Sequence, residues 1–329
     1  MPWCPARAQE VVGLRNGTLT GVVIDAVTKA PVPLALITLG EIRQFASAQG
    51  RFLLRGVREG RADLTVAQIG YGPRTLPAQF RNDSSGPGTA ELTVMLTRVA
   101  LVLPELTVVA SPACGQGVAG SSDLSLGPAI AAVLENARRL LALEQAYPFE
   151  SVFLFLSQQF DSADQLLSTR RGTSMASTKR MRGYQPGRVL ERSGTVNYFT
   201  TSDLARPLFL QSHCLWPAGV DTIEGAPAVV IGFAPVSTIV SPDWSGRLVV
   251  DLATSRLLRS EASLDHLDST RTKLRAVNCQ VRYGEVAPLV LHEAGAQCTL
   301  VDGSKRRTWT LETLRPVSIR FLGKKPGDS

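Results

Sequence analysis

The stretch Gly21-Val-Val-Ile-Asp25-Ala-Val-Thr28-Lys-Ala-Pro31-Val-Pro33-Leu-Ala35-Leu-Ile-Thr-Leu39 decides how the first third of the chain folds. It contains two segments rich in apolar and β-branched residues, separated by turn-forming residues, which is typical of two strands joined by a turn. The period-two pattern begins at residue 17 and continues through further segments at 51–55, 62–66, 91–96 and 106–109. Strands at this close spacing, with Gly and Pro between them, predict a small antiparallel β-sandwich over residues 17–110.

The same stretch resembles the opening of carboxypeptidase regulatory-like domains, a seven-strand-type β-sandwich module. In that fold Asp25 and Thr28 would shape the first turn, and Pro31 would begin a strand where no N–H is needed. Gly50 would supply a left-handed turn before Phe52, whose ring would fill the core. The likeness continues through Gln49-Gly50-Arg51-Phe52, Gly56-Val57, Gly60, 64–66 and Gly70-Tyr71.

The segment 104–110 also resembles the exit of such domains where they precede TonB-dependent outer-membrane receptors. The resemblance implies that residues 17–110 form a non-catalytic binding or interaction module. One departure is Ala48-Gln49-Gly50, which stands where the family has Asp-x-x-Gly and argues against a cation in that loop.

Residues 111–127 are small and polar and predict a linker. Between Pro128 and Tyr147 apolar residues recur at three-four spacing, which predicts a helix. A short helical turn is expected at 202–207, with a Ser or Asp cap. Strand patterns follow the helix at 152–156, 189–190, 196–199, 228–233, 247–252, 257–264, 272–283 and 317–322.

One helix followed by a sequential antiparallel sheet predicts a curved sheet wrapped around that helix over residues 128–323, with a tail at 324–329. This part loosely resembles the lipoprotein-carrier type of half-barrel found in bacterial envelopes, in the segments Gly232-Phe-Ala-Pro235 and Gly246-Arg-Leu-Val-Val-Asp251-Leu-Ala-Thr254.

Residues 1–10 contain Ala6-Arg7-Ala8, which reads like the end of a secretory signal cleaved after Ala8. The basic and apolar regions that precede such a site are absent from this sequence, so a signal-peptide remnant and a Pro-rich terminus both stay open.

Without Cys4, four cysteines remain, and they allow three pairings: Cys114, Cys214, Cys279 and Cys298. We expect bridges Cys279–Cys298 and Cys114–Cys214, and the alternative is four buried thiols. Bridges favour an oxidising compartment, either the periplasm or the outer membrane.

Composition and motifs exclude several classes of protein. The chain of 329 residues has 44% hydrophobic and 19% charged residues, and its apolar runs, such as 152–156, are far shorter than the roughly 18–20 residues of a membrane-spanning helix. It lacks Gly-x-Ser-x-Gly, His-Glu-x-x-His and phosphate-loop motifs. His213 and His266 have no acidic partner at ligand spacing, and the neighbours His292 and Glu293 are expected on opposite faces of a strand. We therefore predict no catalytic, metal or cofactor-binding residue, no cofactor and no enzyme activity.

The net charge of +7 concentrates locally. Seven basic residues between 168 and 192 form a candidate patch for an anionic partner: Arg170, Arg171, Lys179, Arg180, Arg182, Arg188 and Arg192. The alternative is an exposed, solvated strand face. Nucleic acid is not expected, because Tyr184 alone makes no stacking platform.

These observations predict a non-catalytic envelope protein whose first domain binds another envelope protein, a glycan or a lipid. The alternative is a periplasmic lipid or lipoprotein carrier that uses the curved sheet. A hydrolase would need a nucleophile or metal set that the sequence does not reveal.

Overall fold

The computed structural model describes residues 12–15, 17–81, 88–99, 127–180, 183–190, 196–267, 274–287, 289–303 and 308–323. They divide into two compact units, with the boundary after Val99. Both units are built mainly from β-strands, and the predicted fold class, a β-sandwich followed by a helix with a curved antiparallel sheet, is confirmed.

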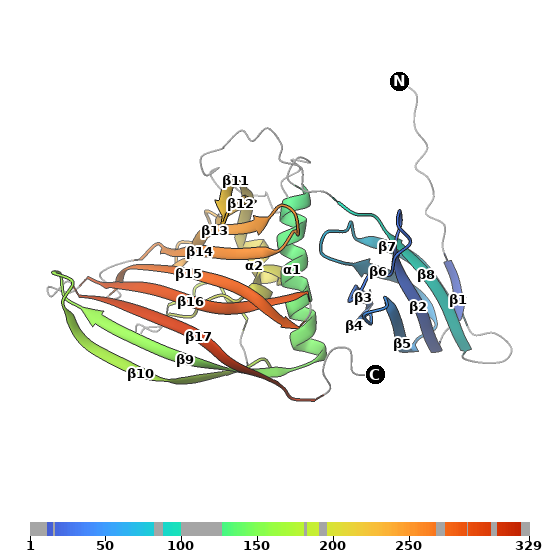
Figure 1. Ribbon diagram of the computed structural model, residues 1–329, viewed down its shortest axis with the longest axis horizontal. Coiled ribbons are helices and arrows are strands. Elements are labelled where there is room, and N and C mark those ends of the chain that lie inside the picture. Colours follow the sequence, from blue (N-terminus) through green and yellow to red (C-terminus); the bar gives the residue numbers. More distant parts are fainter. Residues whose placement is uncertain are drawn as a thin grey trace, which may run out of the picture. The chain divides into compact units, whose positions relative to one another are not determined.

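The first unit is a sandwich of a five-stranded and a three-stranded sheet (Figure 1), with orders β1-β7-β6-β3-β4 and β5-β2-β8. The strands are β1 Val12–Arg15, β2 Gly17–Asp25, β3 Leu36–Leu39, β4 Ile42–Phe45, β5 Arg51–Val57, β6 Gly60–Ala67, β7 Arg74–Arg81 and β8 Gly88–Leu96. Two pairs, β1–β7 and β2–β8, are parallel within an otherwise antiparallel arrangement. A period-two pattern is the same for either direction of pairing, so the sequence could not reveal these two pairs.

The turn after β2 is organised by Asp25, which is almost fully buried. Its carboxylate accepts hydrogen bonds from the backbone N–H groups of Val27 at 2.8 Å and Thr28 at 2.9 Å. The Tyr71 hydroxyl donates to it at 3.1 Å, and Arg98 Nε lies 2.9 Å away. Hydrogen bonds from Thr28, Arg98 and Val27 hold the pKa of Asp25 well below its usual range.

Two glycines in this unit are required by geometry. Gly50 has φ +71° and precedes Phe52, whose ring lies in the core, as expected. A Cβ at Gly21 would lie 2.5 Å from the Phe52 ring and 2.2 Å from the Leu92 carbonyl oxygen. The close approach of β2 to its neighbours therefore excludes a side chain at Gly21.

The second unit is a nine-stranded antiparallel sheet in the order β10-β9-β17-β16-β15-β14-β13-β12-β11. The sheet curves around helix α1, Gly127–Ala146, which packs against β12, β13, β14 and β16 (Figure 1). The remaining elements are β9 Phe149–Phe160, β10 Leu166–Ser177, the 3₁₀ helix η1 Thr201–Ala205, α2 Pro207–Ser212, β11 His213–Ile223, β12 Ala226–Pro235, β13 Asp243–Asp251, β14 Leu257–Asp265, β15 Leu274–Ala287, β16 Val290–Asp302 and β17 Trp309–Phe321.

The core of this unit forms between α1 and the concave face of the sheet, and includes Val133, Ala137, Phe233, Trp244 and Leu248. The sequence did not predict β10 or β11, and it placed His292 and Glu293 on a strand without giving the bounds of β16. The first ten residues of β10 are exposed and show no alternation of burial, and β11 contains Pro and Gly. Instead of strands, the segments at 189–190 and 196–199 form a single bridge between Leu190 and Val196.

Cys279 and Cys298 are register partners on β15 and β16, with Cα atoms 4.1 Å apart, and they form a disulfide. Cys114 lies outside the described residues, so its pairing with Cys214 stays a prediction. Residues 1–10, the strand predicted at 106–109, nearly all of the linker and the tail also lie outside the described residues.

Within the described part of the chain, no helix is long and apolar enough to span a membrane.

Candidate functional site

A mainly apolar cavity of about 140 Å³ lies on the concave face of the second unit's sheet. Strands β9, β10, β15, β16 and β17 supply one side of it, and α1 and the segment before η1 supply the other. Its lining residues are Glu144, Phe149, Ser151, Phe153, Ala176, Thr178, Tyr198, Phe199, Thr200, Val281, His292, Glu293, Gly295, Ala296, Cys298 and Leu314.

Three polar side chains meet at one wall of this cavity. Ser151, on β9, is 2% exposed, and its Oγ lies 3.3 Å from His292 Nε2. The other ring nitrogen of His292, Nδ1, forms an ion pair with the carboxylate of Glu293. Each nitrogen of the imidazole therefore faces one partner.

The contact between His292 and Glu293 corrects the expectation that the two side chains point to opposite faces of a strand. The pairing of β15 with β16 shifts between Tyr283–Glu293 and Arg282–Gly295, so Ala294 is an extra residue in β16. A β-bulge of this kind bends its strand and re-aims side chains. The sequence alone does not reveal this bulge, because the bulge depends on the register in which β16 pairs with β15.

The Glu293 carboxylate is also held from the helical side. Its Oε1 accepts hydrogen bonds from the Thr201 backbone N–H at 2.7 Å and from the Thr201 hydroxyl at 2.8 Å. Burial alone would raise the pKa of Glu293, but His292 and the Thr201 N–H lower it to about 2. Burial likewise acts to lower the pKa of His292, and the charge and contact of Glu293 outweigh it, so that this pKa is raised. Each member of the pair therefore favours the charged form of the other.

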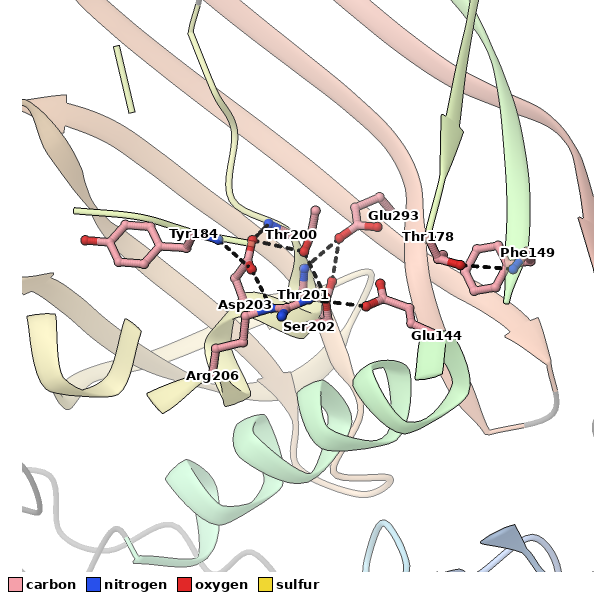
Figure 2. Close-up of polar contacts among 10 residues, drawn as sticks. All are labelled: Glu144, Phe149, Thr178, Tyr184, Thr200, Thr201, Ser202, Asp203, Arg206 and Glu293. Carbon is pink, nitrogen blue, oxygen red and sulfur yellow. Dashed lines mark hydrogen bonds and ion pairs between the residues drawn. The ribbon is translucent and has the colours of Figure 1, made fainter. Parts of the chain in front are cut away.

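Aromatic rings surround the imidazole. Phe149 meets His292 edge-on with ring centroids 5.6 Å apart, and Phe153 does so at 6.3 Å. The Phe149 backbone N–H donates to Thr178 Oγ1 at 3.0 Å (Figure 2), which ties the beginning of β9 to the residue just after β10. The polar side chains at this wall of the cavity are therefore surrounded by apolar side chains.

A second carboxylate, Glu144 in the last turn of α1, also reaches the cavity. Burial raises its pKa to about 7, although a hydrogen bond from Ser202 and the charge of Arg206 act in the opposite direction. Arg206 Nη2 lies 3.8 Å from Glu144, and Arg206 Nε lies 2.9 Å from Asp203. Figure 2 shows this row of polar contacts from Glu144 through η1.

The helical turn predicted at 202–207 is present as η1. Its N-cap is Thr200, whose backbone N–H donates to Asp203 Oδ2 at 2.9 Å. Asp203 Oδ1 accepts the backbone N–H of Tyr184 at 2.9 Å. The N-cap is therefore Thr200 and not the expected Ser or Asp, and Asp203 contributes from the third position of the turn. η1 is anchored to the cavity through Thr201.

A separate buried polar group lies under α2. The Tyr184 hydroxyl donates to Asp243 at 2.5 Å, and His213 Nε2 lies 3.6 Å from the other oxygen of Asp243. Burial lowers the pKa of His213 and raises that of Asp243. None of these groups lines the cavity, although Tyr184 and His213 both pack on Phe209. We assign this group a structural role in docking α2.

The candidate basic patch does not contribute to the cavity. Arg170 and Arg171 pair with Ser157 and Leu156, so successive positions of β10 place them on opposite faces of the sheet. Lys179 and Arg180 follow the end of β10, and Arg188 is exposed. Arg182 and Arg192 lie outside the described residues. Within those residues, no group of three or more His, Cys, Asp or Glu side chains is arranged to hold a metal ion.

No protein-family model matches the sequence, and no curated protein matches it. Several solved structures align at low identity. A DUF1329 family protein from Desulfovibrio piger ATCC 29098 is 13% identical, covers 60% of this chain and 95% of its own, and has a TM-score of 0.32. The LolA superfamily protein NE2245 from Nitrosomonas europaea is 12% identical, covers 60% of this chain and 94% of its own, and has a TM-score of 0.32.

The group B streptococcus pilus 2b backbone protein is 19% identical and has a TM-score of 0.21. It covers 26% of this chain, and the present chain spans 42% of its length. These identities and scores are too low to assign a family or a function. The lipoprotein-carrier resemblance of the second unit and the carboxypeptidase regulatory-like assignment of residues 17–110 therefore both stay predictions.

Proposed function

We propose that this protein is an exported bacterial envelope protein whose second unit binds an acyl group of a lipid or an acylated protein in the cavity between α1 and the curved sheet. The observation that carries the proposal is the cavity itself, which is mainly apolar and opens on the concave face. Apolar concave pockets with a few convergent polar groups are the usual form of small-ligand sites.

The volume of the cavity sets the size of its occupant. About 140 Å³ accommodates roughly five groups of the size of a water molecule, at about 30 Å³ each. This suits a short acyl group or the end of a longer chain. A longer chain would continue along the same face over Phe155 and Leu314, which are half-buried register partners on β9 and β17.

The compartment is part of the proposal. The Cys279–Cys298 disulfide joins two central strands of the sheet. Such bridges persist in oxidising compartments and are rare in the bacterial cytosol. We place the protein in the periplasm or at the outer membrane on this ground.

The test is a binding measurement with a matched pair of variants. Ala296 lines the cavity, and its neighbour Gln297 is exposed on the opposite face of β16. We expect the periplasmically expressed protein to bind fluorescent fatty acids saturably and to carry a lipid detectable by native mass spectrometry. Ala296→Phe would fill the cavity and abolish binding, whereas Gln297→Phe would leave binding unchanged. Absence of saturable binding in the wild type, or equal binding by both variants, would overturn the proposal.

A further inference from the structure

Ser151, His292 and Glu293 lie in the geometric order of a nucleophile, a base and an orienting acid. Ser151 Oγ lies 3.3 Å from His292 Nε2, and His292 Nδ1 contacts the Glu293 carboxylate. A contact slightly longer than 3.2 Å between nucleophile and base is usual where no substrate is bound. The three residues come from β9 and β16, which are separated by about 140 positions in the chain and by β17 in the sheet.

The acid is held in place independently of the histidine. Two hydrogen bonds from Thr201 hold Glu293 Oε1, which leaves Oε2 directed at His292. A carboxylate beside Nδ1 favours the neutral imidazole with its proton on that nitrogen, which leaves Nε2 to accept the Ser151 hydroxyl proton. Thr201 and Glu293 therefore favour the tautomer that a general base requires.

We propose that Ser151, His292 and Glu293 hydrolyse the ester of an acyl group seated in the cavity, by way of an acyl-enzyme on Ser151. The inference rests on the proposed function for its substrate class, because all three residues line the same apolar cavity. The small volume of the cavity favours acyl groups of roughly two to five carbons, because each group of the size of a water molecule takes about 30 Å³. The absence of a Gly-x-Ser-x-Gly elbow does not exclude this chemistry, which is recognised by geometry and not by sequence position.

The reaction balances with water as the only co-reactant. Ser151 Oγ attacks the ester carbonyl carbon while His292 Nε2 takes the hydroxyl proton. The bond from that carbon to the alcohol oxygen breaks, and the alcohol leaves with the proton from His292. Water then attacks the acyl-Ser151 ester and gives a proton to His292. The carboxylic acid leaves and Ser151 takes the proton back.

The negative oxygen that forms in this reaction needs a hydrogen-bond donor. Thr178 lines the cavity, and its Oγ1 already accepts the Phe149 N–H at 3.0 Å. In the described part of the chain no residue accepts the Thr178 hydroxyl proton, which can therefore be donated to an occupant. One hydroxyl stabilises an oxyanion less than two backbone amides do, so we expect activated aryl esters to react and amides to be inert.

The experiment uses the full chain with p-nitrophenyl acetate, butyrate and octanoate, and a fluorophosphonate probe followed by peptide mapping. We expect the probe on Ser151 and hydrolysis of the two shorter esters. Ser151→Ala and His292→Gln would lower kcat/KM at least 100-fold and abolish labelling. Ser157→Ala, on the same face of β9 but outside the cavity, would retain the wild-type rate. Thr178→Val would lower kcat about tenfold with KM unchanged.

Glu293 is a positioning residue, and its test is the pH profile. Glu293→Gln would keep part of the activity and move the acidic limb of kcat/KM to lower pH, because the imidazolium loses the neighbouring charge.

The fatty-acid binding assay separates this inference from the proposed function. Binding without labelling or turnover, or turnover retained by Ser151→Ala, would overturn the triad and leave the binding function intact. Loss of both binding and turnover in the wild type would overturn both.

Discussion

His292 and Glu293 are consecutive residues of β16, and their side chains form an ion pair with each other inside the second unit. A bulge at Ala294 follows the pair directly, whereas a regular strand would direct the two side chains to opposite faces. The pair is buried against Phe149 and tied to η1 through Thr201. It therefore joins the cavity wall to the helical layer of the unit.

Removing one member of this pair should destabilise the protein strongly. His292→Leu leaves the Glu293 carboxylate buried without its cation, which costs about 3 kcal/mol of unfolding free energy. The matched control is Arg320→Leu, which breaks an ion pair whose arginine is 76% exposed and should cost less than about 1 kcal/mol. Urea unfolding followed by tryptophan fluorescence measures both, and equal losses would contradict the prediction.

The burial of Glu144 should make stability fall as the pH rises. Its pKa is raised from 4.5 to about 7 in the folded protein, so folding favours the protonated form. This contribution is fully present below pH 4.5 and is lost as the pH rises through about 7. Glu144→Gln should therefore gain about 2–3 kcal/mol relative to the wild type between pH 4.5 and pH 8.

The comparison of wild type with Glu144→Gln isolates this carboxyl from His292, whose raised pKa contributes stability in an overlapping pH range. Urea midpoints at half-unit pH steps provide the measurement. Parallel profiles for the two proteins would show that Glu144 ionises normally.

The Cys279–Cys298 bridge should stabilise the sheet. It closes a loop with a sequence separation of 19, for which the chain-entropy estimate is about 3 kcal/mol. The double variant Cys279→Ala/Cys298→Ala should lose about that much in guanidinium unfolding without reductant. Peptide mapping of this variant under non-reducing conditions also tests the second bridge, because a Cys114–Cys214 peptide would then be the expected product.

Asp25 should control the local stability of the first unit. Asp25→Asn keeps the shape of the side chain but removes the charge that accepts bonds from Thr28, Arg98 and Val27. Because the pKa of Asp25 is lowered by folding, its contribution is present above about pH 4 and is lost as the pH falls below that.

We expect faster hydrogen exchange in peptides from 17–67 for Asp25→Asn at pH 7, measured by mass spectrometry on the full chain. The difference from the wild type should shrink when the proteins are first equilibrated in acid. Asp63→Asn, an exposed carboxylate on β6, is the control and should exchange like the wild type. Unchanged exchange in Asp25→Asn would show that its hydrogen bonds contribute little.

The sequence by itself determined the elements whose signals are local. Apolar and β-branched runs located β2, β12, β13 and β14, the spacing of apolar residues located α1, and the turn chemistry of Asp25 and Gly50 located the first turns. These signals act over a few residues, because backbone sterics and short-range hydrogen bonds decide them.

Only the tertiary structure decided the parallel pairs, the exposed strand β10 and the cavity wall. Ser151 and Glu293 belong to strands that meet through the pairing of β9, β17 and β16, and the register of β16 on β15 places the bulge that follows Glu293. Sequence motifs missed this constellation, since it has no fixed spacing along the chain. A one-residue change of register would point these side chains to the other face, and register is a property of the whole sheet.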